Sequence, residues 1–85
     1  MFYVYLLRSK SKKDQFYVGY TINLKKRFAE HNALRSKATK PYAPWEIIFY
    51  EAYKSMSDAK RRKLYLKTTK GKKALKIMLK NSMNI

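Results

Sequence analysis

The amino-acid sequence predicts an α+β fold, with a small three-stranded antiparallel sheet flanked by helices in the order ββαβαα. Three short runs rich in aromatic and β-branched residues have the composition of strands. Segments after the second and third runs place apolar residues three and four apart, as amphipathic helices do. With 85 residues the chain can bury one modest core, so residues 1–85 are expected to form a single domain.

The first two runs predict a β-hairpin. Residues 2–8 and 16–21 are strand-like, and the polar segment from Ser9 to Gln15 is short enough to join antiparallel strands. Gly19 interrupts the second strand. It indicates either a bulge or twist, or a close approach of backbone or ligand to the sheet.

A helix is expected from about Leu24 to Asn32. Asn23 is a good N-cap, and Leu24 and Phe28 fall on one face at i and i+4. Residues 33–44 contain both prolines and several basic residues, so they are expected to form a basic loop.

The second half of the chain predicts a strand followed by two helices. The strand covers residues 45–53, and the helices run from about 57 to 67 and from about 70 to 80. Ser55 and Asp58 have the spacing of a capping box at the start of the first helix. The apolar face expected for the last helix consists of Leu75, Met78 and Leu79.

Charge is the strongest bulk signal. Lys and Arg number 21 against five Asp and Glu, which gives a formal net charge of +16. A field of this sign attracts phosphate backbones and speeds their encounter, so nucleic acid is the expected partner. A solvated basic surface without a specific partner is the alternative. Acidic membrane lipid is a weaker rival, because the basic residues are spread along the chain.

Other bulk features favour a reducing compartment. The chain has no cysteine, so it has neither a disulfide framework nor a thiolate metal site. No apolar run approaches the roughly 20 residues needed to cross a bilayer, and no signal-peptide pattern precedes the first strand. The prediction is therefore a cytoplasmic protein.

Short motifs in a fixed order form the most informative pattern of the chain. Tyrosine-bearing runs open it, a basic helix follows, and further fragments continue to about residue 80. These motifs are Tyr3-Val4-Tyr5, Tyr17-Val18-Gly19, Thr21-x-Asn23-Leu24-x-x-Arg27-x-x-x-His31-Asn32, Pro44-Trp45, Tyr50-Glu51, Ala59, Leu66-Lys67 and Lys70-Gly71-Lys72. In their order and spacing, the sequence resembles the GIY-YIG nuclease family, especially its small single-domain bacterial members.

This resemblance implies a three-stranded antiparallel sheet with flanking helices, in agreement with the fold predicted above. It also implies single-step hydrolysis of nucleic acid with one divalent metal, Mg²⁺ or Mn²⁺. By position, Tyr5 and Tyr17 match the tyrosines of the two opening motifs. Arg27 matches the catalytic arginine of the family, and His31 matches its frequent histidine.

These residue types suit an attack on phosphorus. A phenol has a reference pKa of about 10, so it becomes a base for the attacking water only beside a cation or metal. Arg27 can hold phosphate bidentately and stabilise the negative charge of the transition state. His31, one turn further on the same helix face, can relay a proton, bind phosphate or simply orient the following loop. Without the resemblance, the tyrosines would be interpreted as core or surface aromatics, and Arg27 as one of many solvated cations.

One position departs from the pattern that the resemblance implies. The family's metal ligand is a glutamate on the helix after the third strand, and its position here is Lys63. Hard divalent cations prefer anionic oxygens, whereas an ammonium offers only hydrogen-bond donors. Glu51, at the end of the third strand, is a weak substitute. Asp58 is instead expected to cap the helix and pair with Arg62. Lys63 itself can hold the scissile phosphate.

The function predicted from the sequence has two branches. The first is a DNA endonuclease that hydrolyses phosphodiesters, impaired because Lys63 replaces the metal ligand. The second is a catalytically inactive nucleic-acid-binding module, or an accessory subunit of a DNA-repair complex in which a protein partner supplies specificity. Branched or nicked DNA is the expected ligand. The basic residues expected to contact it are Lys25, Lys26, Arg62, Lys63, Lys67 and Lys70.

Overall fold

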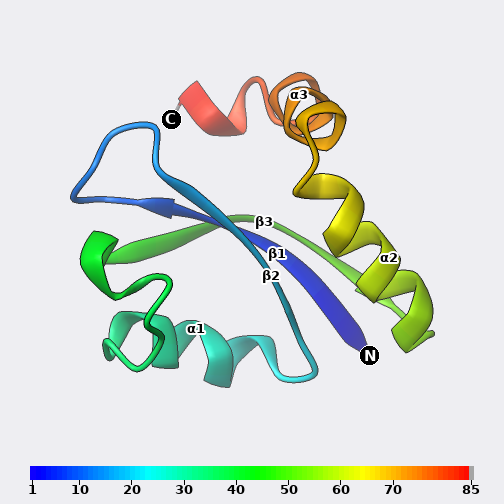
Figure 1. Ribbon diagram of the computed structural model, residues 1–85, viewed down its shortest axis with the longest axis horizontal. Coiled ribbons are helices and arrows are strands. Elements are labelled where there is room, and N and C mark those ends of the chain that lie inside the picture. Colours follow the sequence, from blue (N-terminus) through cyan, green and yellow to red (C-terminus); the bar gives the residue numbers. More distant parts are fainter. Residues whose placement is uncertain (85) are drawn as a thin grey trace.

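A computed structural model describes residues 1–84 and confirms the predicted fold class. The three strands form one antiparallel sheet in the order β2-β1-β3. In Figure 1, α1 lies on one side of this sheet, and α2 and α3 lie on the other. The elements are β1 (Phe2–Ser9), β2 (Phe16–Thr21), α1 (Leu24–Asn32), β3 (Trp45–Tyr53), α2 (Met56–Leu66) and α3 (Thr69–Met78), with short 3₁₀ turns at Lys40–Tyr42 and Ser82–Asn84.

The central strand β1 sets the register of the sheet. Tyr5 lies opposite Gly19 of β2 and opposite Tyr50 of β3. Its neighbour Val4 lies opposite Glu51. Because successive side chains of a strand point to opposite faces, Tyr5 and Glu51 belong to opposite faces of the sheet. This alternation gives the sheet two faces, each of which packs against helices.

Each face of the sheet has its own apolar cluster. On the α2 and α3 side, Val4, Leu6 and Val18 pack with Ala59, Leu66, Leu75 and Leu79. On the α1 side, Tyr5, Leu7 and Trp45 form a second cluster, against which Leu24 and Phe28 pack. The two helix residues therefore form the apolar face predicted for α1.

Helix α1 begins as the sequence predicts. The Asn23 side chain accepts a hydrogen bond from the Lys26 amide at 3.1 Å, which satisfies one of the free amides of the first turn. The helix ends at Asn32, one residue after the buried His31. The helix therefore places Arg27 and His31 one turn apart. Phe28, on the same helix, packs against the apolar cluster of the sheet.

The start of α2 differs from the prediction. Ser55 is the N-cap but makes no side-chain capping hydrogen bond, so the predicted capping box with Asp58 is wrong. Asp58 accepts instead from Arg61 at 3.0 Å, an exposed pair one turn apart. The predicted pair between Asp58 and Arg62 is also wrong. The Arg62 guanidinium donates instead to the half-buried carboxylate of Glu51 on β3.

Helix α3 packs closely against the end of α2. Thr68 caps it by accepting a hydrogen bond from the Gly71 amide at 3.0 Å. A Cβ atom added at Gly71 would lie 2.0 Å from the Tyr65 carbonyl oxygen, so only glycine permits this approach. Leu75 and Leu79 are buried as predicted. Met78 is 46% exposed, because its position on the helix turns it away from the sheet.

Candidate nuclease site

The site is organised around Tyr5 on the α1 side of the sheet. Its ring lies over Gly19 of the neighbouring strand, where an added Cβ would come within 2.2 Å of the Tyr5 Cζ atom. Of the interpretations left open for Gly19, the structure shows a close approach, but not of backbone or ligand as predicted. The group that approaches is a tyrosine ring. Gly19 thereby allows Tyr5 to lie flat against the sheet, where only 1% of it remains exposed.

A buried chain of hydrogen bonds fixes Tyr5 and His31. The Tyr5 hydroxyl and His31 Nε2 are 2.7 Å apart, and His31 Nδ1 is 2.7 Å from the Thr39 hydroxyl. The Trp45 indole N–H donates to the Thr39 carbonyl oxygen at 2.8 Å. Every polar atom of this chain has a partner, and His31 is fully buried. The chain connects α1 to β1 and holds the loop after α1 against β3.

Asn32 adds a second tie between α1 and β3. Its Oδ1 accepts from the Trp45 amide at 2.6 Å, and its Nδ2 donates to the Trp45 carbonyl oxygen at 3.0 Å. These two bonds mimic the pairing of a further strand with β3. Asn32 therefore fixes the point at which α1 ends and positions the imidazole of the preceding residue.

Burial sets the protonation states of this pair. Desolvation, followed by the influence of neighbouring Tyr17, raises the pKa of Tyr5 to about 12, although Arg27 acts in the opposite direction. Desolvation and the charge of Arg27 lower the pKa of His31 to about 4. At neutral pH both groups are uncharged. They are therefore suited to fixing the geometry of the site rather than to exchanging protons with water.

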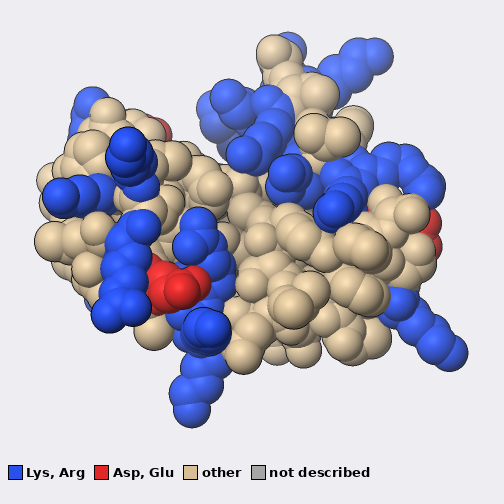
Figure 2. All heavy atoms as spheres, turned by 60° about the horizontal axis from the view of Figure 1, so that its bottom comes forward, with Lys and Arg blue, Asp and Glu red and all other residues tan. Residues whose placement is uncertain are grey.

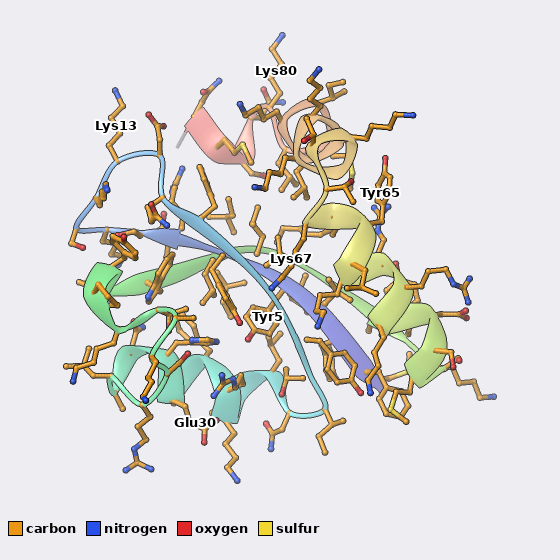
Figure 3. All side chains as sticks on the ribbon, viewed as in Figure 1. Tyr5, Lys13, Glu30, Tyr65, Lys67 and Lys80 are labelled. Atoms are coloured by element: carbon orange, nitrogen blue, oxygen red, sulfur yellow. The ribbon has the colours of Figure 1, made fainter. Side chains whose placement is uncertain are left out.

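Tyr17 is the more accessible phenol of the site. It is half-buried on the edge strand β2, with its ring centroid 5.3 Å from that of His31 and 6.5 Å from that of Tyr5. The Lys67 ammonium lies 5.0 Å from the centre of the Tyr17 ring, within cation–π range. Figure 3 shows Lys67 reaching from the end of α2 across β2 towards Tyr5. Burial and the charge of Lys63 lower the pKa of Lys67.

Arg27 approaches the same cluster from α1. Its Nη1 lies 3.4 Å from Glu30 Oε1, in a pair whose two side chains are about one-third exposed. Burial acts to lower the pKa of Arg27. Interactions with Tyr5 and Glu30 outweigh burial and raise this pKa above its ordinary value, so the guanidinium is a permanent cation. It retains the donors needed to receive a second anion beside Glu30.

The structure divides the other predicted DNA-contacting residues into two groups. Lys25 and Lys26 are exposed on α1, and Lys70 is exposed on α3. Lys63 is half-buried on α2, while Arg62 is committed to Glu51 by bonds of 2.9 and 3.2 Å. Figure 2 shows blue Lys and Arg side chains distributed over the face in view, with few acidic side chains among them.

The expected metal does not fit the donors present. Glu51 lies on the α2 side of the sheet, where Arg62 and the Tyr53 hydroxyl occupy its oxygens, so its position gives no support to a substitute ligand role. Glu30 is paired with Arg27. Within residues 1–84, no group of three or more His, Cys, Asp or Glu is placed to hold a metal ion. At the position of the expected ligand stands the ammonium of Lys63.

Thr39 is a part of the site that the sequence does not indicate, and Trp45 occurs in the Pro44-Trp45 motif without a predicted role in the site. Trp45 is predicted to begin a strand, and Thr39 lies in the segment predicted as a loop. The motif that contains His31 and Asn32 does not predict that Asn32 binds the backbone of Trp45. Only the folded loop brings a threonine hydroxyl to the buried imidazole.

The fold and this cluster define a small α+β domain with phenols, an imidazole and a guanidinium assembled on the α1 face of the sheet. A family model described as the GIY-YIG catalytic domain matches residues 1–76. The chain therefore belongs to the GIY-YIG catalytic domain family, as its sequence motifs predicted.

Relatives of similar length support this membership. A UPF0213 protein of Staphylococcus haemolyticus is 38% identical over 77 residues, which cover 89% of this chain and 92% of the relative. A UPF0213 protein of Clostridium perfringens is 31% identical, covering 98% of this chain and 88% of the relative. A third, from Pediococcus acidilactici, is 32% identical, with 96% and 85% covered. No solved structure gives a significant match.

No helix within residues 1–84 is long and apolar enough to span a bilayer. The longest is α2, with 11 residues, and it carries several charges.

Proposed function

We propose that this chain binds the phosphodiester backbone of DNA at the edge of β2 and acts there as an endonuclease of impaired activity. One observation carries the proposal: the accessible phenol Tyr17 lies beside the Lys67 ammonium, in a cluster that the Arg27 guanidinium joins from the other side. Two cations from different elements can receive one phosphate, with the phenol between them.

The residues of the cluster have separate tasks in this proposal. Arg27 and Lys67 bind the non-bridging oxygens and stabilise the negative charge that grows as water attacks phosphorus. Tyr17 faces the attacking water and accepts a hydrogen bond from it. As the water oxygen bonds to phosphorus and the P–O bond to the leaving strand breaks, the Tyr17 hydroxyl relays the water's proton to solvent, and the departing oxygen takes a proton from solvent. Tyr5 and His31 are neutral and buried, so they position Tyr17 and Arg27 without contacting the substrate.

Impairment follows from the charge at the expected metal position. A divalent metal supplies Lewis-acid stabilisation and a lowered pKa of bound water when a site can hold it. Lys63 offers no lone pair to such an ion and repels it. Phosphate binding remains possible, since an ammonium is a good partner for phosphate. Hydrolysis is therefore expected to be slow relative to binding.

The same observation supports a second candidate function, a DNA-binding module without cleavage. In this case Arg27, Lys63 and Lys67 hold the backbone, and the domain recruits DNA to a protein partner in a repair complex. The two candidates share the binding site and differ only in whether a bound phosphodiester is cut.

Purified protein incubated with nicked, branched and duplex DNA, with Mg²⁺ or Mn²⁺, separates the two candidates. Slow cutting that disappears in Arg27→Ala supports the impaired endonuclease. Binding that depends on Arg27 without any cutting supports the silent module. Absence of DNA binding overturns both.

A charge reversal on α2 tests the cause of the impairment. Lys63→Glu is expected to increase Mn²⁺-dependent cutting at least about tenfold, because it supplies an anionic ligand. Lys60→Glu makes the same charge change on the same helix at an exposed position and serves as the control. Equal effects of the two variants would show that the missing carboxylate is not the reason for slow hydrolysis.

A further inference from the structure

The structure contains a groove that continues from the candidate site. It lies between β2 and α3, on the side of the sheet opposite α1, and has a volume of about 610 Å³. This volume falls within the range of small-molecule sites. Tyr17 and Lys67 line the groove as well as the phenol cluster, so the two spaces adjoin.

The floor of the groove is apolar. Leu6 and Leu75 contribute buried side chains to it, and Phe16 and Met83 contribute half-buried ones. Phe16 adds an aromatic ring from the edge strand β2 to this lining. An apolar and partly aromatic floor suits contact with the face of a nucleobase.

The rim of the groove is cationic. Lys67, Lys72 and Lys76 line it and are exposed. Lys72 and Lys76 are four residues apart on α3, so they lie on the same helix face and form one wall with Lys67. Asp14 is the acid of the lining, and Gln15 adds an amide beside it that can bond the edge of a base.

We propose that this groove binds single-stranded nucleic acid, with an unstacked base on the apolar floor and its phosphates on the three lysines. The proposal rests on the proposed function, because the groove begins at the phosphate site. Bases inside a duplex are stacked and cannot place their faces on the floor. Single strands, overhangs and the displaced arms of branched DNA can do so.

Base removal gives the most direct test. A fluorescent single-stranded oligonucleotide and versions carrying one abasic position each keep the same phosphates. Removal of the base that occupies the groove is expected to weaken binding at least about fivefold, the lower end of what base stacking contributes. Equal affinity for all abasic versions would overturn the groove as a base site.

Paired lysine variants test the rim. Lys72→Gln with Lys76→Gln is expected to weaken single-strand binding at least about fivefold more than blunt-duplex binding. Lys73→Gln with Lys80→Gln removes the same charge from α3 and its end, outside the groove, and Figure 3 shows Lys80 pointing into solvent. Equal losses for the two pairs would show that only the general field of the molecule matters, which overturns the proposal.

These outcomes separate this proposal from the function on which it rests. DNA binding that needs Arg27 but does not distinguish single strands from duplex would leave the phosphate site standing and remove the groove. Thermal unfolding of each variant verifies that it is folded, and the abasic series requires no variant.

Discussion

At the scale of single residues, the site depends on two unusual positions. Gly19 makes room for the Tyr5 ring, and His31 is fully buried with both ring nitrogens bonded. Neither residue has a surface that DNA can reach. Both act by fixing the position of groups that are more accessible, Tyr17 and Arg27.

Substitution of Gly19 by Ala is expected to destabilise the fold. The new methyl group would overlap the Tyr5 ring, and overpacking of this kind costs about 1–3 kcal/mol of unfolding free energy. Urea unfolding measures the loss. The same substitution in a Tyr5→Ala background is the control, because the obstructing ring is then absent. An equal cost in both backgrounds would contradict the packing explanation.

The buried His31 ring is expected to make stability depend on pH. Its pKa falls to about 4 in the folded chain, from an ordinary value of 6.5. Below about pH 6.5 the unfolded chain takes up a proton that the folded chain does not, so stability decreases as the pH drops towards 4. Above pH 6.5 the contribution is constant. The total loss is about 3 kcal/mol.

Unfolding free energies between pH 4 and 7.5 measure this dependence. The His31→Gln variant should be less stable at pH 7 and show a shallower slope over the acid range, since glutamine does not titrate there. Because the chain has one histidine, the difference between the two slopes isolates this residue. Identical slopes would mean that the pKa of His31 is the same in the folded and the unfolded chain.

At the scale of elements, one ion pair ties α2 to the sheet. Arg62 and Glu51 are bonded through two nitrogens and two oxygens, and their side chains are 26% and 24% exposed. The Asp58–Arg61 pair on the same helix is 54% and 75% exposed and joins no second element. The Arg62–Glu51 pair therefore anchors α2 to β3, and with it Lys63 and the C-cap residue Lys67.

Glu51→Gln is therefore expected to cost more than Asp58→Asn. Loss of a half-buried, bidentate pair should lower the unfolding free energy by about 1–3 kcal/mol. Loss of the exposed pair should lower it by at most about 1 kcal/mol. Chemical denaturation of both variants makes the comparison. A larger loss for Asp58→Asn would show that solvent screening does not rank these pairs.

At the scale of the whole molecule, charge is expected to govern the proposed encounter with DNA. The net charge of +16 arises from Lys and Arg residues spread along the chain, and Figure 2 shows many of them on the face in view. Many weak contacts to phosphate give binding that responds strongly to salt and weakly to base sequence.

DNA affinity is expected to fall steeply as salt rises from about 50 to 200 mM. Fluorescence anisotropy gives the slope of log affinity against log salt concentration. Lys67→Gln should reduce that slope by about one, the effect of one lost phosphate contact. Lys54→Gln, in the turn before α2, is the control and should change it less. Salt-insensitive binding would contradict the electrostatic description.

Much of the fold could be predicted because its signals are local. The strand at 16–21, the helix at 24–32 and the strand at 45–53 have the predicted bounds, since aromatic runs, helical spacing and the Asn23 cap act over a few residues. The failures concern choices between partners. The sequence predicts that Arg62 pairs with Asp58 of the same helix, whereas in the structure it pairs with the partly buried Glu51 and the exposed Asp58 pairs with Arg61.

The sequence by itself determined the fold class, the family and the replacement of the expected metal ligand by Lys63, because each depends on residue identity and spacing. Only the tertiary structure decided which of these residues meet. Strand register put Tyr5 and Glu51 on opposite faces, and the packing of α1 buried His31. The groove beside Tyr17 also arises from the approach of α3 to β2. Register and packing join residues far apart in the chain, and no local pattern records them.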